Sequence, residues 1–338
     1  MNVFYTVNDA FVPQLGAALC SVCENNRDMD SIVFHVGELG VTEEHREQLR
    51  TLAAGYGREI SFISVEGLRE RLGFEFDTLG WSEIVVARLL LDTLLPEDVD
   101  RVLYLDGDTI VTGSLRELWE TDMEGKAIAA SAEPTVNRKR RAALGLENLL
   151  YYNSGVLLID LKRWREERTG RRILDFYREK GGKLFAPDQD AINGALPGKI
   201  LTLPPKYNFY NIFWYYPYRT LAKIQRPAEY IPEDVFRDSL EDVRIIHYLG
   251  EDRPWRKGNT HRYAGEYEKY LAMTPWKDTP KEEGWETYFK LYGAFWKALK
   301  PFPMLQYRII DALIPAMMRM RKAGRKKKEA AAGEGTPA

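Results

Sequence analysis

The sequence predicts an α/β fold built on a doubly wound parallel sheet. Short apolar runs alternate with amphipathic segments along most of the chain, which is typical of strands that alternate with helices. Several of these runs end in polar residues, and open sheets of this kind bind ligands at the carboxyl ends of their strands. The composition, 45% hydrophobic and 29% charged, is that of an ordinary globular protein and excludes a disordered or fibrous one.

The N-terminal half supplies most of the regular pattern. Leu15, Ala18 and Leu19 are apolar at helical spacing after the first strand, and Thr42 is placed to cap the next helix. The predicted strands are Val3–Val7, Ile32–Val36, Ile60–Val65 and Arg101–Leu105, and the predicted helices are Val12–Cys23, Glu43–Ala54 and Val85–Leu94. Strands and helices alternate here, as a doubly wound sheet requires.

The C-terminal half continues this pattern and then changes in composition. The predicted strands are Ile128–Ala132, Gly155–Asp160 and Val243–Tyr248, and the predicted helices are Arg171–Lys180 and Asp188–Gly194. The segment Tyr207–Tyr218 holds eight aromatic residues in twelve. These rings either line a binding groove or pack with one another in a core.

Length and charge narrow the choice of function. The 338 residues fit one large domain or two ordinary ones, and 48 Lys and Arg residues against 50 Asp and Glu argue against nucleic-acid binding. The N-terminal residues show no signal-peptide pattern, and no segment has the ~18 uncharged apolar residues of a membrane span. Cys20 and Cys23 form a C-x-x-C on an apolar helix face, so we expect inert core thiols in a reducing cytoplasm rather than a redox or metal site.

The tripeptide Asp106-Gly107-Asp108 is the first candidate for chemistry. It follows an apolar strand directly, so both carboxylates leave at the carboxyl end of that strand. Two carboxylates flanking a glycine can converge on a hard divalent cation, and Gly107 lets a diphosphate approach closely. The same tripeptide is also ordinary turn chemistry, so taken alone it leaves both interpretations open.

Further polar blocks follow along the chain. They are Asn153-Ser154-Gly155, Pro187-Asp188-Gln189-Asp190, and His247-Tyr248-Leu249-Gly250 with Pro254-Trp255 behind it. In this order the blocks resemble glycosyltransferase family 8, which includes bacterial lipopolysaccharide and lipooligosaccharide glucosyl- and galactosyltransferases. The resemblance covers roughly Asn2 to Trp255. It implies a Rossmann-like GT-A fold with a mixed central sheet, a UDP-sugar donor, a Mn²⁺ or Mg²⁺ ion and retention of anomeric configuration.

The resemblance assigns the metal ligands to Asp106, Asp108 and His247. Two carboxylates and one imidazole suit Mn²⁺, with diphosphate oxygens filling the remaining positions. A cation held there would act as a Lewis acid on the departing UDP. Taken alone, His247 fits a buried core histidine as well.

The resemblance assigns uridine binding to the N-terminal block that contains Thr6, Asn8 and Phe11. Asn8 stands where the family usually has Asp, and its amide can still pair with a uracil edge. Phe11 stands where a Tyr often stacks on the base, and a phenyl ring can do the same. The alternative is a strand-to-helix turn with a buried Phe11.

Four more residues match positions that contact the rest of the donor. Arg88, the lone charge in an apolar helix, matches an arginine that reaches the donor sugar, with a snorkelling arginine as the alternative. Asn153 is expected to face the same sugar. Gly250 and Arg253 match a loop that folds over the diphosphate and excludes water; Arg253 replaces the usual lysine and keeps phosphate binding.

Asp188 and Gln189 match the residues beside the anomeric carbon. Asp188 is expected to hold donor-sugar hydroxyls. Gln189 is either the nucleophile of a double displacement or the group that stabilises an oxocarbenium-like state while UDP departs from the front face. An amide oxygen is a poor nucleophile, which favours the second route.

Two clusters of positive charge lie outside these blocks. The run Arg138–Arg141 is expected on a solvated loop or helix face, or else against an anionic acceptor. Residues 308–328 contain eight basic residues and one acid, behind an aromatic-rich segment that begins at Trp285. Their amphipathic pattern is typical of a helix that lies in an anionic membrane surface, with packing on the catalytic domain as the alternative.

We therefore expect a metal-dependent, retaining transferase that moves glucose or galactose from a UDP-hexose to a saccharide or glycolipid of the cell envelope. It is expected in the cytoplasm, docked on the inner face of the cell membrane, with no nucleic-acid partner. Residues 1–275 are assigned to the catalytic domain, 284–328 to membrane docking and 329–338 to a disordered tail. The alternatives are a nucleotidyltransferase, which needs a Gly-rich phosphate loop after the first strand, and a non-catalytic nucleotide-sugar-binding protein with eroded metal ligands.

Overall fold

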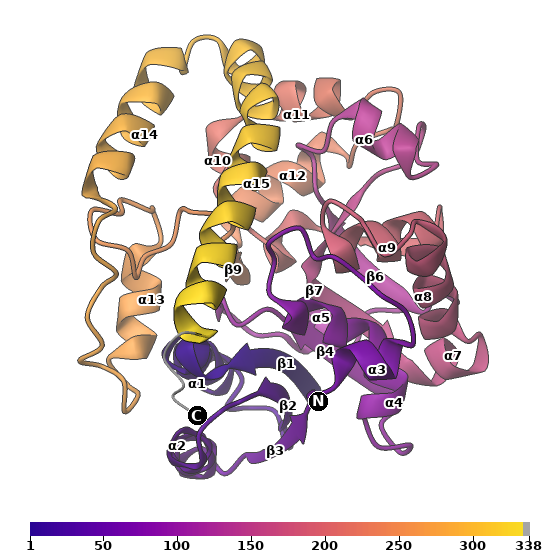
Figure 1. Ribbon diagram of the computed structural model, residues 1–338, viewed down its shortest axis with the longest axis vertical. Helices are drawn as coiled ribbons and strands as arrows, with labels where there is room; N and C mark the ends of the chain where they lie inside the picture. The colour runs from indigo at the N-terminus through magenta and orange to yellow at the C-terminus, as the bar shows by residue number, and fades with distance from the viewer. Residues whose placement is uncertain (334–338) are drawn as a thin grey trace.

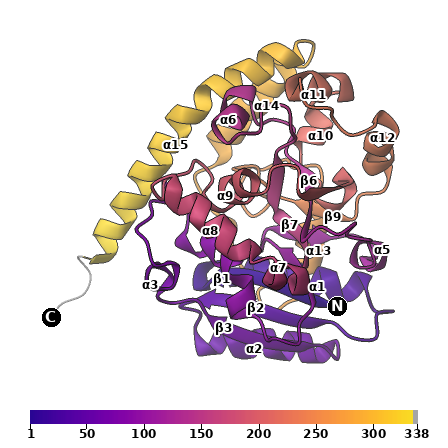
Figure 2. The same ribbon diagram turned by 90° about the vertical axis from the view of Figure 1, so that its right-hand side faces the viewer.

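A computed structural model describes residues 1–333. Its centre is a seven-stranded sheet of order β3-β2-β1-β4-β7-β6-β8, with helices on both faces (Figure 1 and Figure 2). A two-stranded sheet pairs β5 with β9. The strands are β1 Asn2–Asn8, β2 Val33–Leu39, β3 Glu59–Ser64, β4 Arg101–Leu105, β5 Thr109–Val111, β6 Ile128–Ala132, β7 Tyr152–Asp160, β8 Ile200–Leu203 and β9 Ile245–His247.

Most predicted helices form near their predicted bounds. Thr42 caps α2, since its hydroxyl accepts a hydrogen bond from the His45 amide at 3.3 Å. The α-helices are α1 Val12–Asn25, α2 Glu43–Gly55, α3 Leu68–Leu72, α4 Leu91–Leu94, α5 Arg116–Trp119, α6 Arg138–Ala143, α7 Leu161–Glu166, α8 Thr169–Glu179, α9 Pro187–Ala195, α10 Ile212–Tyr215, α11 Tyr218–Gln225, α12 Glu233–Glu241, α13 Ala264–Leu271, α14 Glu286–Leu299 and α15 Pro303–Gly333.

The segment predicted as one helix over Val85–Leu94 differs from expectation. It is a 3₁₀ helix, Glu83–Leu90, followed by the short α4. Residues three apart share a face in both helix types, so apolar spacing does not distinguish a 3₁₀ helix from an α-helix.

The central sheet is mixed, as the family resemblance implied, and the parallel sheet expected from strand–helix alternation is wrong for one strand. β7 runs antiparallel to both of its neighbours, β4 and β6, whereas the other strand pairs of this sheet are parallel. A strand that is covered on both faces is apolar in either direction, so its sequence does not reveal the reversal. The reversal brings the amino end of β7 beside the carboxyl end of β4, where Val156 pairs with Leu105.

Both faces of the inner strands β1, β4, β7 and β6 are buried, as near-continuous apolar strands require. In β1, Val3 and Tyr5 pack in the core that includes α1 and α2, whereas Phe4 packs in a second core that includes α7, α8 and α9. Cys20 and Cys23 lie in the first core as free buried thiols, and burial raises the pKa of Cys23 to about 12. The prediction that both cysteines lie in the core is therefore confirmed.

The C-terminal part forms a helical hairpin, α14 and α15, along one side of the domain (Figure 1). Among the described residues, no helix is both long enough and apolar enough to cross a bilayer. Of the tail expected to be disordered, residues 329–333 continue the backbone of α15, and residues 334–338 lie outside the described part. The side chains of Arg325 to Lys328, part of the predicted basic cluster, also lie outside it.

Candidate active site

Four chain segments meet at the end of the central sheet where β1 and β4 finish. The carboxyl ends of β1 and β4 supply Thr6–Asn8 and Asp106–Asp108, and the amino end of β7 supplies Asn153–Gly155. β9 ends in His247, which pairs across to Thr109, the neighbour of Asp108. The fold therefore gathers polar residues that lie far apart in the sequence.

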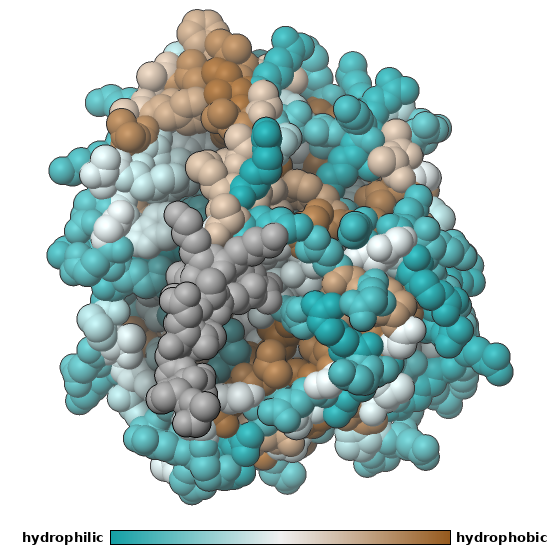
Figure 3. All heavy atoms as spheres, viewed as in Figure 1, coloured by the Kyte–Doolittle hydropathy of each residue, from teal (hydrophilic) through white to brown (hydrophobic). Residues whose placement is uncertain are grey.

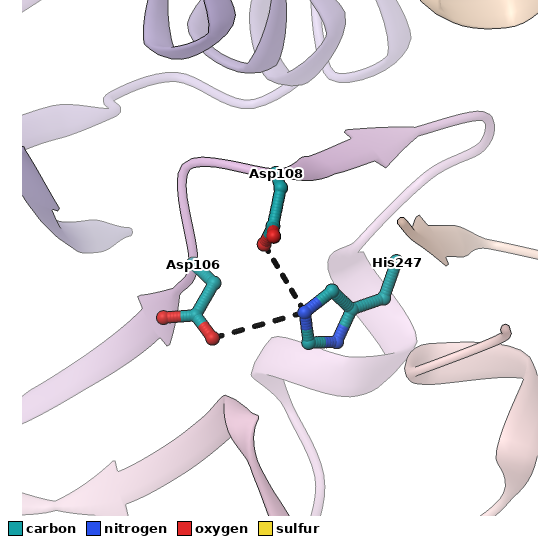
Figure 4. A group of neighbouring side chains, drawn as sticks. All are labelled: Asp106, Asp108 and His247. Carbon is teal, nitrogen blue, oxygen red and sulfur yellow. Dashed lines mark ion pairs between the residues drawn. The ribbon is translucent and has the colours of Figure 1, made fainter. Parts of the chain in front are cut away.

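Asp106, Asp108 and His247 converge on one point (Figure 4). His247 Nε2 lies 3.1 Å from Asp108 Oδ1 and 3.7 Å from Asp106 Oδ2. One ligand atom from each residue lies within 4.8 Å of the others. Two carboxylate oxygens and one imidazole nitrogen at this spacing form a donor set for a divalent cation.

A chain of amides fixes which His247 nitrogen faces the carboxylates. His247 Nδ1 lies 2.8 Å from Asn208 Oδ1, and Asn208 donates from Nδ2 to Asn153 Oδ1 at 2.9 Å. Asn153 in turn donates from Nδ2 to a Glu133 oxygen at 3.0 Å. Because the Asn208 oxygen accepts, Nδ1 carries the proton and Nε2 keeps its lone pair for a metal.

The other oxygen of Asp106 is held from the protein side. Tyr104 donates to Asp106 Oδ1 at 2.7 Å, and its hydroxyl lies 3.0 Å from that of Thr6. Arg88 donates to the same Asp106 oxygen at 2.7 Å, and its Nε lies 3.2 Å from Asp188 Oδ2. These bonds leave Asp106 Oδ2 directed toward His247.

Arg88 is enclosed between two carboxylates, with 3% of its surface exposed. Burial alone would lower the pKa of its guanidinium, but Asp106 and Asp188 raise that pKa above its ordinary value. Burial raises the pKa of Asp188 despite the opposing effect of Arg88. Burial also opposes ionisation of Asp108, yet His247 and Arg253 together hold its pKa below the ordinary value. The buried charges are therefore paired, and Arg88 is not a snorkelling surface residue.

A cavity of about 450 Å³ opens beside these residues and is of the size of small-molecule sites. Ten predicted site residues line it: Thr6, Asn8, Phe11, Arg88, Asp106, Gly107, Asp108, His247, Gly250 and Arg253. In its wall Arg253 donates to Asp108 Oδ2 at 3.0 Å. Phe11 packs edge-on against Trp255, with ring centroids 5.7 Å apart.

Comparison with known proteins identifies the family. Residues 2–258 match the family model of glycosyl transferase family 8. The chain belongs to this family. A lipopolysaccharide 1,2-glucosyltransferase of Escherichia coli K12 is 27% identical over 283 residues, which cover 82% of this chain and 79% of that protein. General stress protein A of Bacillus subtilis is 22% identical over 279 residues, 82% of this chain and 94% of that protein.

A solved structure connects the family 8 sequence to a known fold. The crystal structure of the galactosyltransferase LgtC, in complex with donor and acceptor sugar analogs, matches with a TM-score of 0.69 and 26% identity. The match covers 85% of this chain and 99% of that one. The fold is therefore GT-A, with the mixed central sheet that the resemblance implied, and family membership supports glycosyltransferase activity.

Three predicted residues do not line the cavity: Asn153, Asp188 and Gln189. Asn153 reaches the site through the amide chain to His247. Asp188 Oδ2 contacts Arg88 and accepts a hydrogen bond from the Ser154 hydroxyl at 2.8 Å. Gln189 Oε1 accepts one from the Ser154 amide at 3.0 Å. Ser154 thus links both residues of α9 to the edge of the sheet.

Gln189 is held at both ends of its side-chain amide. Besides the bond to Ser154, its Nε2 donates to the Tyr151 hydroxyl at 3.1 Å. Tyr151 in turn donates to Asp190, which is buried and pairs with Arg140. The orientation of the Gln189 amide is therefore set by a connected polar network.

The expectation that Arg138–Arg141 is solvated, or faces an acceptor, is wrong for two residues. Arg140 pairs with the buried Asp190, and Arg141 is fully buried and donates to the Gln225 carbonyl at 2.6 Å. Arg138 and Lys139 are exposed, as predicted. One face of the short α6 is thus structural, which a run of like charges does not reveal.

Sequence reasoning missed the residues that orient Asp106 and His247. Tyr104 lies inside an apolar strand and Asn208 inside the aromatic segment, and each carries a buried polar group that needs a partner. It also missed Gly80–Ser82, which line the cavity from the loop before the 3₁₀ helix. A lone polar group in an apolar run was the available signal for the first two.

The aromatic segment belongs mainly to the core. Its buried members are Tyr207, Phe209, Tyr210, Phe213 and Tyr216. Tyr215 is half-buried and stacks on Trp296 of α14 at a centroid distance of 3.8 Å. Packing is therefore the correct interpretation for the buried rings.

Gly155 offers a direct test of the metal cluster. A Cβ at this position would lie 2.1 Å from His247 Cε1 and 2.7 Å from Asp106 Oδ2, so alanine must displace both ligands. We expect Gly155→Ala to weaken Mn²⁺ binding about 10- to 100-fold in calorimetric titration. Gly265→Ala, whose Cβ would meet open space in α13, is the matched control and should bind as the wild type does. Equal Mn²⁺ affinity in both variants would contradict this site.

Proposed function

We propose that this family 8 protein transfers glucose or galactose from a UDP-sugar to a saccharide or glycolipid of the cell envelope, with retention of configuration. One observation carries the proposal: Asp106, Asp108 and His247 meet at the wall of the cavity, with His247 Nε2 facing both carboxylates. A nucleotidyltransferase would need a Gly-rich loop after β1, whereas this chain continues into the 3₁₀ turn Asp9–Phe11. The intact donor set argues against a non-catalytic binding protein.

The donor set fits a divalent cation, and its mixture of carboxylate and imidazole favours Mn²⁺ over Mg²⁺. Asp106, Asp108 and His247 would hold the ion. When bound, it supplies Lewis-acid stabilisation of the charge on the diphosphate leaving group. Tyr104 orients Asp106, and Asn208 orients His247, so the protein arranges its ligands in advance.

The uridine is proposed to bind at the end of β1. Asn8 offers an amide to the uracil edge, and Phe11 offers a ring face to the base. Thr6 and Gly107 complete this part of the wall. A Cβ on Gly107 would come within 3.3 Å of the Phe11 ring, so glycine preserves room for that ring.

The diphosphate is proposed to bind under the loop after β9. Gly250 and Arg253 of that loop line the cavity. The Arg253 guanidinium now pairs with Asp108 and can bind phosphate oxygens bidentately when the donor enters. Loop closure excludes water and so limits hydrolysis of the donor.

Asn153 and Asp188 are proposed to hold donor-sugar hydroxyls, and Gln189 to lie beside the anomeric carbon. The Gln189 oxygen already accepts the Ser154 amide proton, which favours a stabilising dipole over a nucleophile. In the front-face route, the acceptor oxygen bonds to the anomeric carbon as the bond from that carbon to the UDP oxygen breaks. The proton of the acceptor hydroxyl passes to the UDP oxygen that leaves. Gln189 stabilises the oxocarbenium-like state that forms while the old bond breaks and the new bond forms.

The acceptor class is proposed from the named relatives. The relative from Escherichia coli is named for lipopolysaccharide glucosylation, and a 24% identical protein of Salmonella typhimurium LT2 is named lipopolysaccharide 1,3-galactosyltransferase. The match to the Salmonella protein covers 81% of this chain and 79% of that protein. A hexose of an envelope glycan or glycolipid is the acceptor consistent with both.

The proposal is tested by UDP release from the purified chain with UDP-glucose or UDP-galactose, with and without Mn²⁺. We expect metal-dependent donor hydrolysis with one of the two sugars. Proton NMR of the first-formed sugar should show the α-anomer, as retention of the donor configuration requires. No release of UDP from either sugar, with or without metal, would refute the proposal.

The C-terminal hairpin is proposed to dock on the anionic inner face of the cell membrane. α15 contacts the body through polar groups: Asp311 accepts from Asn137 at 2.8 Å, and Lys322 lies 2.6 Å from Asp77. Two of its apolar side chains, Met304 and Tyr307, also pack against the core, whereas others are exposed. The exposed ones on the hairpin and its turn are Leu291, Phe302, Leu305, Leu313, Met317 and Met320.

Hydrophobic side chains gather where α14 and α15 meet (Figure 3). Exposed Arg308 and Arg319 lie on the same helix as the outward apolar residues, as in helices that lie in an anionic surface. A helix that was simply packed on the domain would bury its apolar side chains, whereas Leu313, Met317 and Met320 of α15 stay exposed.

If α15 docks on the membrane, charged substitutions of its exposed apolar residues should weaken vesicle binding. Leu313 is 52% exposed and Met320 67% exposed, and each would enter the lipid interface. We expect Leu313→Glu with Met320→Glu to reduce co-sedimentation with phosphatidylglycerol-containing vesicles about 10-fold or more. Met273→Glu, a 45% exposed methionine outside the hairpin, is the matched control. Equal sedimentation of the double variant and the wild-type protein would contradict docking through α15.

A further inference from the structure

We propose that Trp285 and Arg256 are positioning residues for the donor, so that the N-terminal end of α14 is part of the donor site. The inference rests on the proposed function, because it concerns the loop Leu249–Gly258, called the donor loop from here on. Gly250, Arg253 and Arg256 of this loop line the cavity, and Arg253 reaches Asp108.

The donor loop is paired through its backbone to a segment that precedes α14. Lys257 N donates to Glu282 O at 2.9 Å, and Glu282 N donates to Trp255 O at 2.8 Å. Gly258 lies so near α14 that a Cβ there would come within 2.9 Å of Glu286 Cα. The C-terminal arm of the loop is thus fixed by residues beyond 258, where the family match ends.

The Arg256 side chain ties both arms of the donor loop to the same segment. It is 10% exposed, pairs with Glu251 inside the loop, and lies 3.0 Å from Glu282 outside it. It also donates to the Glu251 carbonyl at 3.0 Å. Its guanidinium carbon stands 3.7 Å from the centre of the Trp285 ring, a close cation–π contact.

The other arm of the donor loop is held through Asp252. Asn211 and Tyr215 donate to one oxygen of Asp252, the latter at 3.1 Å, and Asn259 donates to the other at 2.7 Å. Tyr215 stacks on Trp296 of α14. Helix α14 therefore supports the loop at two separate places, one at each end of the helix.

This support has a consequence for donor binding. Fixing a loop on ligand binding costs conformational entropy. A loop that is already held in its binding position loses little further entropy when the ligand binds. Arg253 pairs with Asp108 and is proposed to bind the diphosphate, so loosening the loop weakens the hold on the diphosphate. Because the groups beside the anomeric carbon lie on α9 and β7, the rate of the chemical step should change little. The expected signature is a raised KM with kcat nearly unchanged.

The experiment compares Trp285→Ala with Trp285→Phe in Mn²⁺-dependent UDP release, together with calorimetric binding of UDP in Mn²⁺. We expect Trp285→Ala to raise both KM for the UDP-sugar and Kd for UDP about 10-fold, with kcat within about twofold of wild type. Trp285→Phe, which keeps an aromatic face for Arg256, should restore most of the affinity. Leu291→Ala, which removes an exposed apolar side chain from α14, is the matched control and should keep the wild-type KM.

A second variant guards against poor folding of the first. Glu282 is half exposed, so Glu282→Gln removes its ion pair with Arg256 at little risk to the core, and KM should rise about threefold. Unchanged KM and Kd in Trp285→Ala, or a fall in kcat alone, would overturn the inference. A wild-type chain that neither binds UDP with Mn²⁺ nor releases it would instead overturn the proposed function, so the two failures are distinguishable.

Discussion

Replacing Asp108 by alanine is expected to reduce Mn²⁺-dependent UDP release about 1,000-fold or more. Asp108 supplies one of the three donor atoms of the metal cluster and is the partner of both His247 and Arg253. The variant therefore loses a ligand and leaves two cationic or protonatable groups facing each other. Initial rates with the active UDP-sugar measure the effect, and circular dichroism checks the fold.

Asp108→Asn is the sharper form of the same test. The amide keeps the size and shape of the side chain but carries no negative charge and is a poor ligand for a hard cation. If the carboxylate matters as a metal ligand, the rate of UDP release should be as low in Asp108→Asn as in Asp108→Ala, and excess Mn²⁺ should not restore it. Wild-type rates in Asp108→Asn would show that the aspartate only shapes the turn.

Removing the charge of Arg88 is expected to have the largest effect on stability. Arg88→Met keeps a long apolar side chain but leaves the buried Asp188 and the partly exposed Asp106 as neighbouring carboxylates without their cation. Breaking a buried ion pair by removing one partner costs about 3–5 kcal/mol of unfolding free energy. Urea unfolding near neutral pH measures this loss, and transferase activity should fall with it because Asp106 loses its orientation.

The pH dependence of that loss identifies its cause. Burial already raises the pKa of Asp188 in the folded protein, and Arg88 opposes the rise, so Arg88→Met should raise the pKa further. The folded variant then binds a proton at a higher pH than the unfolded chain does, so the loss of stability should shrink as the pH is lowered from neutral. Arg171→Met, which breaks an exposed pair with Asp175, should change stability little at neutral or lower pH. A loss in Arg88→Met that does not depend on pH would contradict this electrostatic account.

The sequence predicted the elements of this fold better than their directions. β1, β4 and β6 lie where the apolar runs placed them, and Thr42 caps α2 as expected. The direction of β7 was missed, because burial on both faces produces the same apolar run in either direction. That reversal places Asn153–Gly155 beside Asp106, so the site depends on a feature of the sheet that periodicity does not encode.

The candidate site was predictable where chemistry-bearing residues follow strands. Asp106, Asp108 and His247 do so, and the structure brings them together. Asn208, which sets the His247 tautomer, could not be identified, because its role depends on packing between segments distant in the sequence. The same holds for Trp285, which lies beyond the family match and reaches the donor loop only in the folded chain.

The central claim is that Asp106, Asp108 and His247 hold a divalent cation that binds the diphosphate of the donor. Calorimetric titration of UDP into the wild-type chain, once with Mn²⁺ and once with EDTA, tests it most directly. The account predicts a Kd about 100-fold lower with Mn²⁺, and loss of that difference in Asp108→Asn. The same Kd for UDP with and without the metal would contradict it.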